Sequence, residues 1–163
     1  MLAFLGAMVL NMIRKKKRKR KKRRVKEPLT DELLKELLAS PSAEAFAQDH
    51  RFKNRTTAEY LNQLLEEHGL DRADVIRDSF LNYTFAYQIF VGTRQAKRDK
   101  LLQIAFAMHL SYLETNRLLE ISEVNGLYCK NRRDAIIVFC LDHGSSLQEV
   151  NEELYRFGED TIC

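Results

Sequence analysis

Apolar residues recur at intervals of three and four along most of this chain, which is the spacing of one face of an α-helix. The pattern is clearest from Tyr60 to Leu65 and from Leu147 to Leu154. Only six Gly and two Pro occur among 163 residues, so few positions favour the turns that join short β-strands. A hydrophobic fraction of 45% is sufficient for a core. We therefore predict an all-α protein with one main core.

An N-terminal helical extension is expected over residues 27–55. The segment TDELLKELLA, from Thr30 to Ala39, starts with a capping residue and places its leucines on one face. Pro41 ends this helix, and Ser42–Asp49 is long enough for another turn or two.

The centre of the chain contains two short helices separated by a very brief turn. The helix Thr57–His68 ends at Gly69 and is followed by Arg72–Ser79, for which Asp71 is the cap. The turn is Phe80, Leu81 and Asn82, and the second short helix is Tyr83–Val91, closed by Gly92. Two short helices so joined, with longer amphipathic helices on either side, have the spacing of a helix-turn-helix unit.

This stretch also resembles a known family. The sequence LNYTFAYQIFVGTR, followed by RDKLLQIAFAM, is similar to the Xre/Cro, or lambda-repressor-like, helix-turn-helix family, and particularly to small Firmicutes proteins of that type. The resemblance covers roughly Thr57–Cys163: Ile76 matches an aliphatic position of the first helix, Ala86 and Ile89 the core face of the recognition helix, and Gly92 its closing glycine. It implies a five-helix DNA-binding domain over residues 56–124 that regulates transcription.

The remaining helices complete that domain and follow it. We expect Lys97–Met108 and Leu113–Ile121 to be its fourth and fifth helices, with Ser111 as a cap. Residues 125–163 should form a C-terminal helical hairpin. Its first helix, Asn131–Leu141, contains the run AIIVFCL, which could equally be a buried strand and is assigned as helix from the resemblance. Its second begins with a capping box, either Ser145 with Gln148 or Ser146 with Glu149, and ends at Gly158.

A recognition helix at Tyr83–Val91 would present a defined set of side chains to DNA. Asn and Gln pair with adenine, Thr binds phosphate or caps the helix, and basic residues hold the flanking phosphates. No acid occurs from Ser79 to Arg98. The predicted DNA-binding residues are Asn82, Tyr83, Thr84, Tyr87, Gln88, Val91, Arg94, Lys97 and Arg98.

The same residues permit another interpretation. Aromatic residues at helical spacing, here Tyr83, Phe85, Tyr87 and Phe90, can be core or interface residues, and Arg94–Lys100 can be a solvated turn. Phe80 replaces the family's usual turn glycine, so this turn must be strained or change type, and Tyr83 replaces a common basic residue. The alternative function is therefore a protein-interaction adaptor that keeps the fold without reading DNA.

Charge is distributed unevenly along the chain. Twelve of the 27 Lys and Arg residues lie between Arg14 and Lys26, so the other 15 face all 23 Asp and Glu residues, and the rest of the chain has a net charge of −8. An acidic body repels DNA at long range. DNA binding would therefore depend on a local basic surface.

Residues 1–26 combine an apolar run with the basic run that follows it. Met1–Ile13 would span only about 20 Å as a helix, against roughly 30 Å of bilayer hydrocarbon. Secretory signals place the positive charge first, which is the reverse of the order here. Three interpretations stay open: a membrane-surface tether, a disordered arm that binds nucleic acid, or an untranslated segment with the true start at Val25.

Nothing in the sequence predicts an enzyme. It has no phosphate-binding glycine loop and no HExxH pair, and its four His residues are scattered. Its three Cys residues lack CxxC spacing, which disfavours a zinc site or a disulfide framework and favours a reducing cytoplasm. We expect no cofactor, and double-stranded DNA as the partner. A homodimer or a protein partner would use the C-terminal helices Asn131–Phe157.

Overall fold

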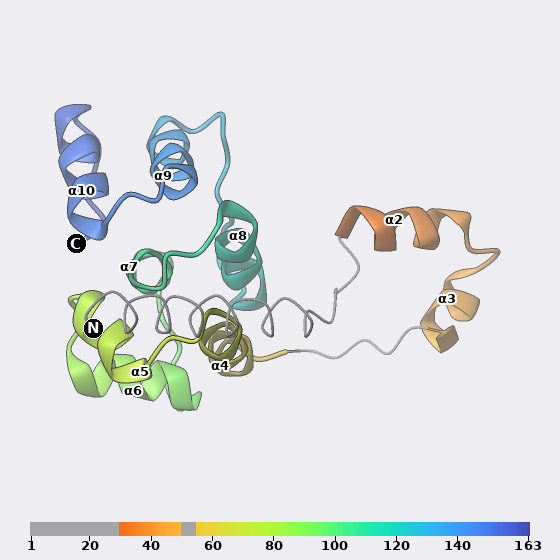
Figure 1. Ribbon diagram of the computed structural model, residues 1–163. Coiled ribbons are helices and arrows are strands. Elements are labelled where there is room, and N and C mark those ends of the chain that lie inside the picture. Colours follow the sequence, from red (N-terminus) through yellow and green to blue (C-terminus); the bar gives the residue numbers. More distant parts are fainter. Residues whose placement is uncertain (1–29, 50–54) are drawn as a thin grey trace, which may run out of the picture. The chain divides into compact units, whose positions relative to one another are not determined.

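The computed structural model describes residues 30–49 and 55–163, and the regular elements in these ranges are α-helices, with no β-strand among them (Figure 1). The all-α prediction is therefore confirmed. The chain divides into two compact units, Met1–Asn54 and Arg55–Cys163. The interpretations given above for residues 1–26 concern a segment outside the described ranges.

The described part of the first unit is a pair of short helices, α2 (Thr30–Ala39) and α3 (Ala43–Asp49). The side chain of Ser42 caps α3 by accepting a hydrogen bond of 3.1 Å from the Ala45 backbone N–H. Phe46 is buried, whereas Leu34, Leu37 and Leu38 of α2 are exposed. Both predicted helices are present.

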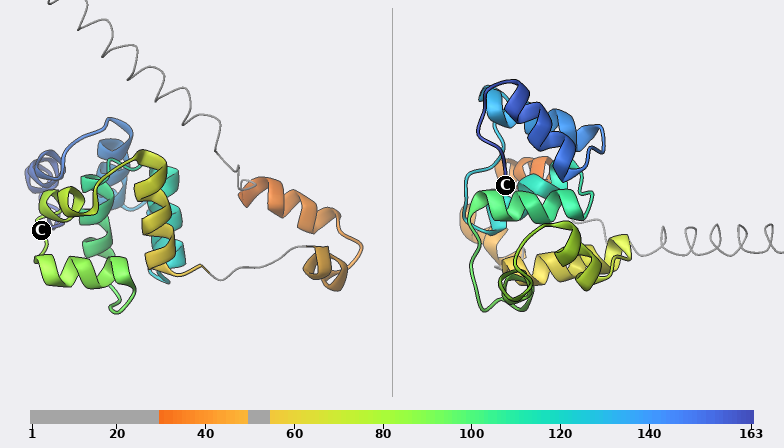
Figure 2. Two further views of the ribbon diagram at one scale, coloured as in Figure 1. Left: turned by 60° about the horizontal axis from the view of Figure 1, so that its bottom comes forward. Right: turned by 90° about the vertical axis from the view of Figure 1, so that its left-hand side faces the viewer.

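The second unit contains the seven helices that the sequence pattern predicts, with ends that shift by one or two residues. Views from two sides show α7 between a layer formed by α4, α5 and α6 and a layer formed by α9 and α10 (Figures 1 and 2). The helices are α4 (Thr57–His68), α5 (Arg72–Asp78), α6 (Tyr83–Val91), α7 (Arg98–Ala107), α8 (Tyr112–Ile121), α9 (Arg132–Asp142) and α10 (Leu147–Arg156).

Side chains at the helix N-termini account for several of these boundaries. Reciprocal capping boxes form at α4 (Thr56 with Glu59), at α8 (Ser111 with Glu114) and at α10. At α10 the pair is Ser146 with Glu149, which decides between the two predicted alternatives. The segment AIIVFCL lies in α9, as the resemblance implied, and the Asn131 side chain caps this helix.

A hydrogen bond between side chains joins the end of α4 to the start of α8. His68 Nε2 lies 3.0 Å from Glu114 Oε1. The hydrogen bond from His68, assisted by those from Ser111, lowers the pKa of Glu114 to about 2. The same carboxylate therefore closes the capping box of α8 and fixes this helix to α4.

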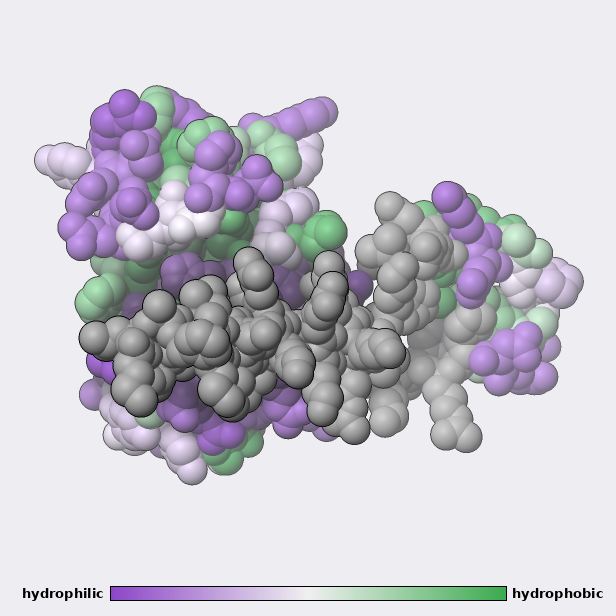
Figure 3. Space-filling model, in the orientation of Figure 1, coloured by the Kyte–Doolittle hydropathy of each residue, from purple (hydrophilic) through white to green (hydrophobic). Residues whose placement is uncertain are grey.

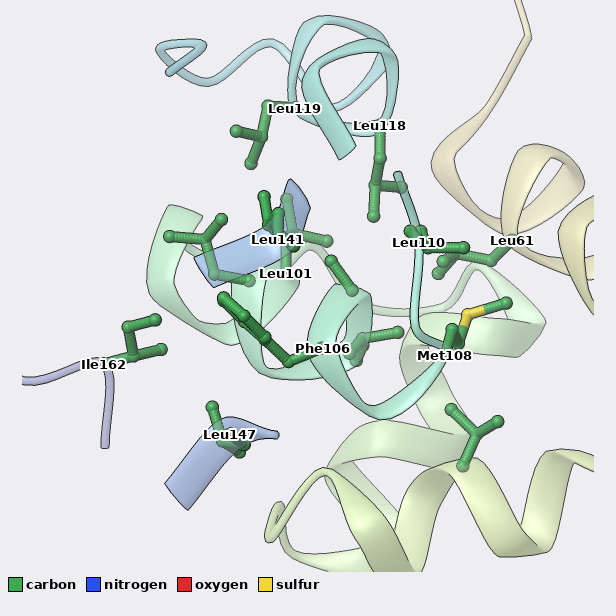
Figure 4. Close-up of a cluster of buried hydrophobic side chains, with 14 of the residues drawn as sticks. Leu61, Leu101, Phe106, Met108, Leu110, Leu118, Leu119, Leu141, Leu147 and Ile162 are labelled. Atoms are coloured by element: carbon green, nitrogen blue, oxygen red, sulfur yellow. The ribbon is translucent and has the colours of Figure 1, made fainter. Parts of the chain in front are cut away.

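The core is built around α7. Six consecutive residues of this helix, Leu101–Phe106, are buried, so it contacts neighbours on every side. Figure 4 shows Leu101 and Phe106 among side chains of α8, α9 and α10 and beside Ile162 of the C-terminal tail. Because the buried cluster runs from Tyr60 to Ile162, no gap in the core marks the predicted domain boundary at residues 124 and 125.

The last helix, α10, is strongly amphipathic. Leu147, Val150 and Leu154 of α10 are buried, and Gln148, Glu149 and Glu152 are exposed. Over α9 and α10, at the upper left of Figure 3, the visible surface is mainly hydrophilic. Among the described helices, none has the length and apolar character required to cross a bilayer.

Candidate nucleic-acid interface

Helices α5 and α6 are the two short helices, joined by a brief turn, that the sequence predicts, and local hydrogen bonds define both ends of α6. The Asn82 side chain accepts a hydrogen bond of 3.2 Å from the Phe85 backbone N–H. At the other end Gly92 has a φ of 85°, in the left-handed region. A Cβ atom at this position would lie 3.2 Å from the Ala58 Cβ, so glycine here also allows α6 to approach α4.

The turn before α6 is strained at Phe80. This residue has a φ of 55°, and its side chain is 71% exposed. The expectation that the turn must be strained or change type is thus confirmed as left-handed backbone at a bulky residue. The buried Ser79 supports the turn, since its hydroxyl donates to the Ile76 carbonyl at 2.7 Å and accepts from the Leu81 N–H at 3.4 Å.

Phe80→Gly should stabilise the fold by about 1 kcal/mol. Glycine relieves the left-handed strain, and the exposed ring makes little contribution to the core. We expect the thermal midpoint to rise by a few degrees. In the control, Asp78→Gly in the helical backbone of α5, the midpoint should fall instead. A lower midpoint for Phe80→Gly would show that the phenyl ring contributes packing that its exposure does not suggest.

One face of α6 is open to solvent. Tyr83, Thr84, Tyr87 and Val91 are exposed, and Gln88 is half-buried. The opposite face, Ala86, Ile89 and Phe90, is in the core. All the side chains predicted on the exposed face of the helix therefore lie on one surface, although Gln88 is less accessible than a fully exposed residue. The four aromatic residues of α6 differ in exposure. Phe90 is in the core, Phe85 is half-buried, and Tyr83 and Tyr87 are exposed.

A polar network that sequence reasoning did not identify holds α6 against α4 and α5. Asn62 Nδ2 donates to the Ala58 carbonyl at 2.7 Å and to the Phe90 carbonyl at 2.8 Å. Arg72 Nη2 donates to Asn62 Oδ1 at 2.8 Å, and its guanidinium lies over the Tyr87 and Phe90 rings. The one available signal was a polar residue, Asn62, within the apolar stripe of α4.

The two exposed tyrosines are ordered against each other. Their ring centroids are 6.3 Å apart and the planes differ by 12°. Because Arg72 also lies 5.8 Å from the centroid of Tyr87, this ring is held between a cation and a second ring. The exposed face of α6 is therefore a partly preorganised aromatic surface.

The three predicted phosphate-binding cations are placed differently. Arg94 is exposed, with its guanidinium 5.0 Å from the centre of the Phe85 ring. Lys97 is exposed at the start of α7. Within the described residues neither Arg94 nor Lys97 forms an ion pair.

Arg98 is turned into the body of the unit. Its Nη2 lies 2.8 Å from Asp134 Oδ1, and its guanidinium also donates to the carbonyls of Asn125 and Gly126. These bonds leave little of the group for phosphate. We therefore correct its assignment and treat Arg98 as a residue that joins α7 to α9.

Acidic residues border the exposed face of α6. On α5, Asp74 and Asp78 are exposed and pair with Arg77 at 2.8 Å and 2.9 Å. On the α4 side, an open depression of about 600 Å³ includes Glu59 and Glu66 among its lining residues. Apart from Arg72, which lies over the Tyr87 ring, the cations next to this face that have no acidic partner are the exposed Arg94 and Lys97 of the segment that follows α6.

No arrangement for a metal ion is present in residues 30–49 and 55–163, where no three His, Cys, Asp or Glu side chains gather suitably. No known protein-family model, curated protein or solved structure matches the chain.

Proposed function

We propose that this chain is a DNA-binding transcription regulator of the Xre/Cro type, whose helices α4–α8 correspond to the lambda-repressor-like five-helix domain. One observation carries the proposal: α6 exposes a face without acidic residues, and two exposed cations without an acidic partner, Arg94 and Lys97, follow it directly. In this arrangement α6 enters the major groove and the α6–α7 segment contacts the adjacent phosphates.

The local distribution of charge matters more than the total. Residues 55–163 contain 12 Lys and Arg against 17 Asp and Glu, so the unit as a whole is repelled by DNA. Charges beyond about 8–10 Å are largely screened at physiological salt, whereas direct phosphate contacts release counterions. Arg94 and Lys97 can therefore bind phosphate although the unit is acidic. A homodimer, held through α9 and α10, would double these contacts.

The test is DNA binding by the double variant Arg94→Ala, Lys97→Ala of the full chain. Fragments selected from genomic DNA by the parent chain are titrated at several salt concentrations. Because each lost phosphate contact removes about one released counterion, the slope of log affinity against log salt should fall by about two for all sequences. Thermal melting of the variant should be unchanged, since both side chains are exposed.

A matched control separates the proposed surface from charge in general. Lys130→Ala removes an exposed cation between α8 and α9. It should reduce the affinity for DNA, and the slope of log affinity against log salt, less than Arg94→Ala or Lys97→Ala alone does. If the double variant binds as the parent does, the α6 surface does not bind DNA, and the basic run Arg14–Lys26 becomes the source of any binding.

A second function, a protein-interaction adaptor, has its own supporting observation. Phe80, Tyr83 and Tyr87 are 71%, 59% and 45% exposed, and acids of α5 lie close to them in sequence. Exposed aromatics at this density are typical of protein contacts. This function becomes the better account if removing Arg94 and Lys97 leaves DNA binding unchanged.

A further inference from the structure

We propose that the sequence read by α6 is an A·T-rich half-site, recognised in the major groove through thymine methyl groups and adenine edges. The inference rests on the proposed function and specifies its ligand. It follows from which chemical groups the exposed face of α6 offers, and from which groups are missing there.

Helix α6 itself carries none of the charged groups that read G·C pairs, and the guanidinium of Arg72 beside it is bonded to Asn62. Guanine is typically recognised by Arg or Lys, which donate two hydrogen bonds to O6 and N7, and cytosine by a carboxylate that accepts from N4. Helix α6 has the sequence YTFAYQIFV and contains no basic or acidic residue. The next cation in the chain is Arg94, which follows the helix and lies over the Phe85 ring.

Groups for reading A·T pairs are present. Tyr87 and Val91 are exposed one turn apart and offer apolar surface to the thymine methyl group. Thr84 and Gln88 lie on the same side of the helix, three residues before and one residue after Tyr87. The amide of Gln88 can donate to N7 and accept from N6 of adenine.

The apolar part of this face is held in place before DNA binds. Tyr87 stacks with Tyr83 and lies under the Arg72 guanidinium, and Arg72 is itself bonded to Asn62. A side chain fixed by its neighbours loses little conformational entropy when it contacts a methyl group. Burying one methyl group contributes about 0.8 kcal/mol, which is about a fourfold change in affinity.

The experiment uses the full chain and the tightest-binding duplex selected from genomic DNA. In one set of duplexes, thymine in each half-site is replaced by uracil, which lacks only the methyl group. In a second set, A·T pairs are replaced by inosine·cytosine, which presents the major-groove groups of G·C without its minor-groove amino group. We expect about a fourfold loss for each contacted methyl group and at least a tenfold loss for inosine·cytosine pairs under Gln88.

The variant Tyr87→Ala provides the matching test on the protein. It should lose the preference for thymine over uracil at the base pairs that Tyr87 contacts and keep any preference that depends on Val91, whereas Lys130→Ala should keep the parent's full discrimination. Selected half-sites rich in G·C, or affinities that do not change with uracil or inosine, would overturn the inference. That result differs from failure of the proposed function, because binding would still depend on Arg94 and Lys97.

Discussion

Asp134→Ala should lower the free energy of unfolding by about 3 kcal/mol or more, one of the two largest effects that we expect in this chain. The side chain of Asp134 is 10% exposed and lies 2.8 Å from Arg98, whose side chain is 22% exposed. Its second oxygen accepts from the Tyr128 backbone N–H at 3.0 Å. Alanine would leave the guanidinium of Arg98 partly buried without its carboxylate.

An exposed ion pair of α10 supplies the control. Glu153 lies 2.6 Å from Arg156, and their side chains are 39% and 67% exposed, so Glu153→Ala should cost no more than about 1 kcal/mol. Urea unfolding followed by circular dichroism would give both values. Equal losses for the two variants would contradict the structural role assigned to the pair between α7 and α9. The loss of stability in Asp134→Asn should lie between those of Asp134→Ala and the control variant, since the amide oxygen can still accept from the Tyr128 backbone N–H.

Helix positions could be predicted from the sequence because their causes are local. A Ser or Thr followed three residues later by Glu specifies the start of α4, α8 and α10 through contacts within one turn. Helix α9 is different. Its apolar run carries no clear period, and the resemblance, not the residues, indicated that it is helical. Of the two alternatives at Ser145 and Ser146, the structure forms the box at Ser146, whose hydroxyl accepts a hydrogen bond of 3.2 Å from the Glu149 backbone N–H.

The sequence indicated which types of residue lie at the candidate site, but not the contacts that several of these side chains make. Arg98 was grouped with Arg94 and Lys97 because it ends a stretch, Ser79–Arg98, that contains no acid. Its partner, Asp134, is 36 residues away, and periodicity carries no information about such a pair. The same reason explains why Asn62 and Arg72 were missed: Asn62 bonds the Phe90 carbonyl 28 residues further along the chain.

The strained turn shows the converse case, in which a local rule was sufficient. A bulky residue at a position where the resembled family usually has glycine predicted a turn that is strained or of another type, and Phe80 has a φ of 55°. This strained turn leads directly into α6 and its exposed face. Whether the surface meets DNA or protein is what the Arg94 and Lys97 variants decide.

Ile162→Ala should destabilise the fold by at least about 2 kcal/mol, although this residue is next to the end of the chain. Its side chain is 3% exposed and belongs to the main core. Terminal residues are poorly ordered unless other groups hold them. Here the Ile162 N–H donates to Asn151 Oδ1 at 2.7 Å, and Arg133 donates to the carbonyls of Asp160 and Thr161.

The matched control is Thr161→Ala, which changes an exposed neighbour and should alter stability by less than about 0.5 kcal/mol. Urea midpoints of the two variants, measured with the parent, give the comparison. Amide exchange in α9 and α10 should also be faster in Ile162→Ala, because the tail bonds to Arg133 of α9 and Asn151 of α10. A variant as stable as the parent would mean that the tail does not close this core in solution.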